Sequence, residues 1–277
     1  MSGAALTLDH VGIVGSDLET LAAAFVRLGF CLTPLARHAG GRTGNRCAMF
    51  RDGGYLELVA TVNGGISATL DRFLGRYSGV HILALGIGDT TAACERLRRA
   101  GIDVHADRSE RSTDDSDPTA PLVAFALLTP PDPPEGRIHL IHHLTPDAMW
   151  QERFLSHPNQ AVRLEEAILV APAPAETAAR LSVLAGRPVQ PDPAGGYVLS
   201  LQTGRLRILS PASWASQHPN RTAPTLPWIG GLTLATADGN AALHRLLTDR
   251  GIDHDQSPGL LQVEAAGVVF RFRADQG

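Results

Sequence analysis

The fold is predicted from one stretch near the start of the chain, Leu8-Asp9-His10-Val11-Gly12-Ile13-Val14, and from its copies. A copy at residues 164–170 reads LEEAILV, and each stretch is typical of a short apolar strand that leads through a turn into a helix. Apolar residues at helical spacing follow the first copy, namely Leu18, Leu21, Ala22, Phe25 and Leu28. Self-similarity of this kind is typical of a fold built from repeated units.

A second pair of copies matches equally well. Residues 80–85 (VHILAL) continue through a helix to residues 100–103 (AGID), and residues 230–235 (GGLTLA) continue to residues 250–253 (RGID) without a gap. Short strands follow each of the four helices, and the last of them fall at residues 55–60, 137–142, 205–210 and 268–272. We therefore predict an α+β protein made of four βαβββ modules, in which modules one and three, and modules two and four, are most alike.

The length of 277 residues allows two domains, and the repeat indicates that they arose by duplication of a two-module unit. A polar segment that carries Trp and Pro follows the second module and is expected to be the linker. The predicted divisions are residues 1–146 for the N-terminal domain (modules 5–62 and 79–143), 147–162 for the linker, and 163–277 for the C-terminal domain (modules 163–212 and 228–274).

Composition narrows the possible functions. All 24 basic residues are arginine, so the chain can form neither a lysine Schiff base nor a P-loop. The net charge of −4 gives no basic footprint for nucleic acid, and no apolar run approaches the roughly 18 residues of a membrane span. The first nine residues do not resemble a signal peptide, and Cys31, Cys47 and Cys94 make no disulfide framework. We expect a cytoplasmic protein with a small-molecule substrate, and leave a homodimer open.

Four βαβββ modules paired into two domains resemble the vicinal oxygen chelate superfamily. The stretches LDHV (residues 8–11) and DGGYLEL (residues 52–58) are similar to its glyoxalase-like branch. The resemblance implies that each pair of modules forms an open, cup-shaped mixed sheet with helices outside. It also implies a divalent metal ion in the cup, held by residues from the first and last strand of each module.

Placed on this sequence, the resemblance gives His10 and His81 on the first strands and Glu57 and His142 on the last strands. Imidazole and carboxylate ligands suit Fe, Mn, Ni, Zn or Co. Glu57 is then the single carboxylate at the metal and the candidate catalytic residue. For His10 and His81 the alternative is a strand histidine bonded to backbone. A one-residue change of register would place His139 and His143, rather than His142, in the cup.

The C-terminal pair of modules carries different residues at the matching positions, namely Glu166, Arg207, Gly231 and, approximately, Arg271. Glycine offers no ligand, and guanidinium groups repel a cation. We therefore predict that the C-terminal cup binds no metal. We also expect Glu166 to form a salt bridge with Arg207 or Arg271 in place of the ion.

A glycine-rich loop at residues 40–46 (GGRTGNR) precedes a strand, and Asn45 and Arg46 are its candidate contacts to an anionic substrate. The leading hypothesis is a metal-dependent, glyoxalase-like enzyme whose small, oxygen-rich substrate chelates the ion in the N-terminal cup. Isomerase, lyase and dioxygenase chemistry stay open. The alternative is a metal-free protein of the same fold that binds or sequesters a small molecule.

Overall fold

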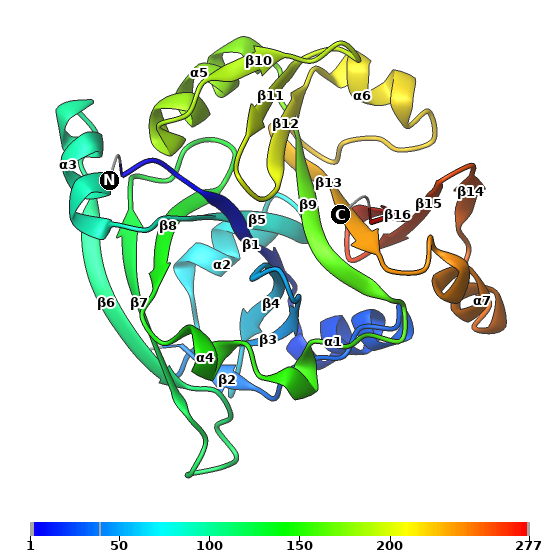
Figure 1. Ribbon diagram of the computed structural model, residues 1–277, viewed down its shortest axis with the longest axis horizontal. Helices are drawn as coiled ribbons and strands as arrows, with labels where there is room; N and C mark the ends of the chain where they lie inside the picture. The colour runs from blue at the N-terminus through cyan, green and yellow to red at the C-terminus, as the bar shows by residue number, and fades with distance from the viewer. Residues whose placement is uncertain (1–2, 39, 276–277) are drawn as a thin grey trace.

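The computed structural model describes residues 3–38 and 40–275. Its first half contains two βαβββ units (Figure 1). The first unit consists of β1 (Thr7–Val14), α1 (Leu18–Arg27), β2 (Ala36–Arg37), β3 (Thr43–Met49) and β4 (Tyr55–Thr61). The second consists of β5 (Gly79–Gly86), α3 (Thr90–Arg99), β6 (His105–Ser112), β7 (Leu122–Thr129) and β8 (Arg137–His143). The short helix α2 (Ala68–Leu74) connects them.

The second half repeats the pattern. The third unit consists of β9 (Ala161–Val170), α5 (Pro174–Ala185), β10 (Val189–Pro191), β11 (Tyr197–Ser200) and β12 (Arg205–Leu209). The fourth consists of β13 (Trp228–Thr236), α7 (Ala241–Asp249), β14 (Asp255–Ser257), β15 (Leu260–Ala265) and β16 (Val268–Ala274). Helix α6 (Pro211–Gln217) joins these units, while α4 (Pro146–Met149) and the 3₁₀ helix η1 (Glu152–Phe154) join the halves. The α+β class and the fourfold βαβββ order are confirmed.

The main helices of the units carry recurring residues at their two ends, which explains why the repeat can be recognised in the sequence. Asp17 and Asp89 begin α1 and α3, and each carboxylate accepts a hydrogen bond from a backbone N–H of the first turn. Each of the four helices is followed by a glycine with positive φ, where a side chain would be strained. These glycines are Gly29, Gly101, Gly186 and Gly251.

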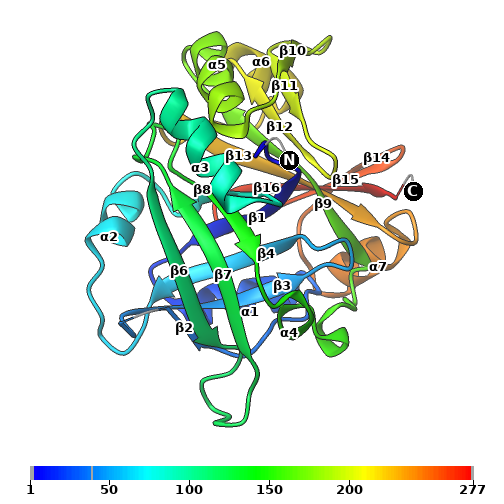
Figure 2. The ribbon, with the colours of Figure 1, turned by 60° about the vertical axis from the view of Figure 1, so that its left-hand side comes forward.

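The strands of each half form one curved sheet. In the first half β1 pairs in parallel with β4 and antiparallel with β5, and β5 pairs in parallel with β8. Figure 2 shows β6 and β7 running side by side along one wall of this cup. The second half repeats the arrangement through β9 and β13. The pair Ile229 and Val80 joins the two sheets into one, and an isolated parallel bridge between Thr7 and Thr203 adds a second link between the halves. The division into two domains at the predicted boundaries stays a prediction.

The hydrophobic core lies between the sheet and the helices outside it, and the predicted linker also packs against the first cup. Phe25 of α1 is fully buried in the core with Leu83 of β5. Met149 and Leu155, within the segment between the halves, are buried against Tyr55. Burial of each such side chain stabilises the fold by roughly 1.5–3 kcal/mol. Among the described residues, no helix is long and apolar enough to cross a membrane.

Candidate active site in the N-terminal cup

A cavity of about 290 Å³ lies inside the N-terminal cup. Its histidine and carboxylate residues come from β1, β4, β8 and the segment before β3, and they are His10, Glu57, His139, His143 and His38. Its apolar wall includes Val59, Leu70, Ile82, Phe125, Leu127, Ile141 and Met149. Two guanidinium groups, those of Arg111 and Arg137, also line it. A concave site with a few convergent polar groups in an apolar wall is typical of small-molecule binding.

His10 is oriented by its neighbour in sequence. Its Nδ1 donates to Asp9 Oδ1 at 2.7 Å, and the same oxygen accepts from His143 Nε2 at 3.2 Å. Burial acts to raise the pKa of Asp9, but the hydrogen bonds from His10 and His143 outweigh it and lower that pKa. The ring of Tyr55 stacks on His10 with 4.3 Å between centroids. Because Asp9 and Tyr55 hold the ring in this way, Nε2 is the nitrogen of His10 that faces Glu57.

Glu57 is 8% exposed and is held by two neighbours. Its Oε1 accepts from Asn45 Nδ2 at 2.5 Å and from His38 Nε2 at 3.3 Å, while His38 Nδ1 is hydrogen-bonded to Thr43. Burial acts to raise the pKa of Glu57, but His38, with further charge from His10 and Arg111, holds that pKa well below its usual range. The carboxylate is thus a permanent negative charge in the cavity wall and a weak base.

The donor set fits a divalent ion in part. His10 Nε2 and Glu57 Oε2 face each other at 3.9 Å, and two electron-pair donors in this position are stabilised by a cation between them. Donors at about 2.1 Å from a tetrahedral ion lie about 3.4 Å apart, so a small movement suffices. A carboxylate on the far nitrogen, as Asp9 provides, is common for a metal-bound histidine.

His139 is the third donor in this wall. Its Nδ1 is hydrogen-bonded to Thr129 Oγ1 at 3.0 Å, and burial lowers the pKa of His139 to about 4, so the ring is neutral at pH 7. Yet no group of three His, Cys, Asp or Glu side chains among residues 3–38 and 40–275 is close enough to hold an ion as it stands. His139 must approach His10 and Glu57 to complete a site.

The expected position of His81 in the cup is not what the structure shows. In β1 and β4 His10 pairs with Tyr55, whereas in β5 and β8 the residue opposite Arg137 is Ile82. Ile82 therefore holds the position equivalent to His10 and lines the cavity. The register of β1 and β5 shifts at this point, so that His81 is an extra, bulged residue. A bulge interrupts the alternation on which the prediction depended.

Instead, His81 is fully buried between the rings of Phe73 and Tyr77, with ring centroids at 4.8 and 3.9 Å. Its Nε2 donates to the Tyr77 carbonyl oxygen at 2.8 Å, and Nδ1 has no hydrogen-bond partner. The structure thus places His81 as the backbone-bonded strand histidine that the sequence left as the alternative.

His142 also lies outside the cavity wall, whereas His139 and His143 line it. The register of β5 and β8 pairs Ala84 with His139, as that of β1 and β4 pairs Gly12 with Glu57. His139 is therefore the counterpart of Glu57, three residues before the predicted one. An odd offset reverses the face of a strand.

The two candidate substrate contacts, Asn45 and Arg46, point to opposite faces of β3. Asn45 faces the cup but is bound to Glu57, so it positions that carboxylate. The next residue along β3 points to the other side of the sheet, where Arg46 Nη2 donates to Glu19 of α1 at 2.9 Å. Arg46 does not line the cavity, which contradicts its predicted contact with an anionic substrate.

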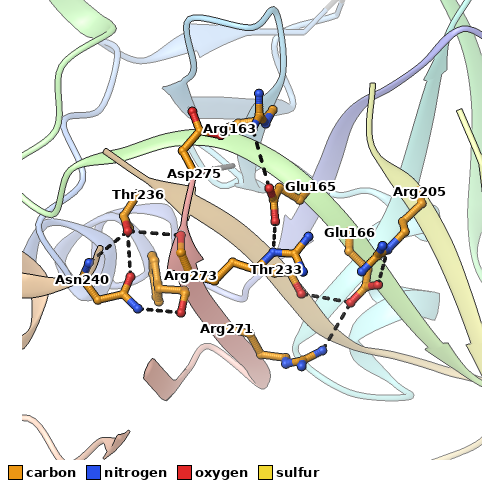
Figure 3. A network of polar contacts seen from close by, with 11 residues as sticks. Arg163, Glu165, Glu166, Arg205, Thr233, Thr236, Asn240, Arg271, Arg273 and Asp275 are labelled. Carbon is orange, nitrogen blue, oxygen red and sulfur yellow. Dashed lines mark hydrogen bonds and ion pairs between the residues drawn. The ribbon is translucent and has the colours of Figure 1, made fainter. Parts of the chain in front are cut away.

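In the C-terminal half, charged side chains occupy the positions that match the first cup (Figure 3). Glu166 is 1% exposed, and Arg271 approaches its Oε1 at 3.3 Å, so that of the two alternative partners expected for Glu166 the structure has Arg271. Arg205 donates to its Oε2 at 2.6 Å and Thr233 to its Oε1 at 3.0 Å. Arg207 pairs with Asp192 rather than with Glu166.

The residues missed from the sequence include His38, Tyr55, Ile82 and Arg111 in the cavity wall, and Asp9, which contacts His10 from behind that wall. Asp9 and Tyr55 stand within the motifs that gave His10 and Glu57, so adjacency was their signal. For His139, the glycine before the strand was the signal, because Gly54-Tyr55 and Gly136-Arg137 precede Glu57 and His139 at the same distance. The sequence carries no comparable signal for His38 or Arg111.

Paired βαβββ units curved into open cups define the vicinal oxygen chelate class of folds. The chain belongs to the glyoxalase-like domain family, whose model matches residues 8–185. No curated protein is similar enough in sequence to count as a relative.

Solved structures with the same fold cover nearly the whole chain. A hypothetical protein from Staphylococcus aureus has 14% identity and a TM-score of 0.69, covering 98% of this chain and 100% of its own. A mutant of 4-hydroxymandelate synthase from Streptomyces coelicolor has 13% identity and a TM-score of 0.66, covering 99% and 94%. The Mn(II)-bound glyoxalase from Novosphingobium aromaticivorans has 12% identity and a TM-score of 0.58, covering 99% and 83%. At these identities the likeness shows the fold alone.

Proposed function

We propose that the protein is a metal-dependent, glyoxalase-like enzyme whose small, oxygen-rich substrate binds in the N-terminal cup. The observation that carries the proposal is the pair His10 Nε2 and Glu57 Oε2, which face each other in the cavity wall at 3.9 Å. A divalent ion there would be held by His10 and Glu57, with His139 as the third ligand. When bound, it would act as a Lewis acid toward oxygen atoms of the substrate.

The surrounding residues fix the geometry of these ligands. Asp9 keeps the proton of His10 on Nδ1, and Asn45 and His38 keep Glu57 oriented and ionised. Because the pKa of Glu57 is held well below its usual range, this carboxylate suits the role of ligand better than that of base. Ile82 at the fourth position leaves more of the ion open to substrate than a four-ligand site would.

Metal content tests the proposal directly. Protein purified without a histidine tag and incubated with Mn²⁺, Co²⁺ or Zn²⁺ is expected to retain about one equivalent after gel filtration. His10→Ala and Glu57→Gln are expected to abolish retention, and Asp9→Asn to weaken it about 10- to 100-fold. His142→Ala is the matched control, because His142 lies on the same strand as His139 outside the cavity wall. Equal retention in wild type, His10→Ala and Glu57→Gln would reject the metal site.

A second candidate function is metal-free binding of a small molecule. It is favoured by the isoleucine at the fourth position and by the hydrogen bonds that already occupy Glu57 Oε1. Wild-type protein that retains no metal but binds a ligand in the cup would support this alternative.

A further inference from the structure

One of the two guanidinium groups that line the cavity has no carboxylate in contact with it among the described residues. Arg137 is bound to Asp132, with Nε at 3.0 Å from Oδ1. Arg111 lines the same cavity but forms no ion pair with any of the described residues. Because partly buried charges are normally paired, the missing partner of Arg111 is expected to be an anion from outside the chain.

The strand geometry holds Arg111 in place. It lies opposite Val123 in the β6–β7 pair, and its guanidinium carbon is 6.0 Å from the ring centroid of Phe125. It also lowers the pKa of the buried Cys47 thiol, although burial outweighs this effect. A thiol is a weak acceptor, so the donors of Arg111 are largely free for a stronger one. A planar guanidinium fork matches the two oxygens of a carboxylate.

The remaining wall around Arg111 is apolar and rich in rings. Phe125 and His143 have centroids 6.4 Å apart, and His143 and Tyr55 have centroids 6.3 Å apart. Leu127 and Ile141, which pair across β7 and β8, extend this wall. A volume of about 290 Å³ lies at the lower end of the roughly 300–1,000 Å³ of small-molecule sites. The cavity therefore suits one small molecule with an apolar body and a single anionic group.

We propose that Arg111 anchors the carboxylate of the substrate, and that this substrate is a small monocarboxylate with an apolar body. The inference rests on the proposed function for the location of the site, but the anchor needs no metal. It replaces Arg46, the residue that the sequence offered for an anion, with an arginine of β6 that lines the cavity.

Isothermal titration with benzoate, and with benzamide as its neutral isostere, tests the anchor in EDTA-treated protein and again with Mn²⁺. Wild type is expected to bind benzoate more tightly than benzamide. Arg111→Gln is expected to weaken benzoate binding about 10- to 100-fold, the loss that follows removal of a hydrogen bond to a charged group, and to leave benzamide binding unchanged. Arg111→Lys, which keeps the charge without the fork, is expected to fall between them.

Arg108→Gln is the matched control, since Arg108 is exposed and lies on the other face of the same strand. The proposal is overturned if wild type does not bind benzoate, if benzamide binds as tightly, or if Arg111→Gln binds benzoate like Arg108→Gln. Metal retention is measured in the same samples. If Arg111→Gln retains metal normally and binds benzoate with unchanged affinity, the anchor alone is rejected. Failure of the proposed metal site shows separately, as equal metal retention in wild type and His10→Ala.

Discussion

The buried His81 should make the fold sensitive to acid. This side chain is fully buried between Phe73 and Tyr77, and its Nδ1 has no hydrogen-bond partner that would stabilise a proton there. Burial lowers the pKa of His81 from 6.5 to about 4. Between these two values the unfolded chain binds a proton at this residue and the folded chain does not. The contribution of the neutral, buried His81 to the free energy of unfolding is therefore fully present above pH 6.5 and is lost as the pH falls toward 4.

The size of the effect follows from the two pKa values. At pH 4.5 the protonation of His81 in the unfolded chain lowers the free energy of unfolding by about 2.5 kcal/mol, and above pH 7.5 this contribution vanishes. The test compares wild type with His81→Phe, which keeps an aromatic ring in the stack but has no titrating nitrogen. His105→Gln removes an exposed imidazole and serves as the control.

The assay is urea unfolding at pH 7.5 and pH 4.5, followed by circular dichroism. His81→Phe loses the hydrogen bond to the Tyr77 carbonyl at both pH values, so this cost cancels in the comparison. We expect its loss of stability between the two pH values to be about 2.5 kcal/mol smaller than that of wild type. An equal loss in wild type and His81→Phe would refute the burial of a neutral His81.

Two further substitutions test the two cups. Glu166→Ala removes the carboxylate that Arg205 and Arg271 share, and should lower the free energy of unfolding by about 3 kcal/mol in urea titrations. A loss below about 1 kcal/mol would show that the pairs are solvated. Ile82→His places a fourth donor opposite His10 and should tighten Zn²⁺ binding at least about 10-fold by calorimetry. Unchanged affinity would contradict the equivalence of Ile82 and His10.

The fold could be predicted because its signals are local and occur four times. A strand, a capped helix and a glycine with positive φ recur in each unit, so an error in one copy is corrected by the others. The spacing from Gly29 to the next strand differs from that after Gly101, but the order of elements does not. The sequence did not reveal that the segment between the halves packs into the first cup, since Met149 contacts residues nearly a hundred positions away.

The site was predicted less well because it depends on register rather than on order. His10 and Glu57 both line the cavity; β1 and β4 pair in regular register from His10 onward, and the register shift of β1 falls before His10, between Leu8 and His10. His81 lies outside the cup because one bulged residue shifts the register of β5. His142 lies outside it because the prediction aligned β8 with β4 three residues out of register. Arg111 lies on a charged edge strand whose composition reads as solvated, and only the curvature of the sheet turns it inward.

The charges of the cup connect the two proposals. Without an ion, ionised Asp9 and Glu57 exceed the unpaired Arg111 by one negative charge, and the neutral His139 adds nothing. A divalent ion beside Glu57 would change this to one positive charge in excess, which favours a ligand with one negative charge that reaches both the ion and Arg111. A monocarboxylate with a second oxygen near the ion satisfies both, because Arg111 takes the carboxylate and leaves the ion to the other oxygen. In the C-terminal cup, by contrast, Arg205 and Arg271 already neutralise Glu166, so that site has no comparable demand for an ion.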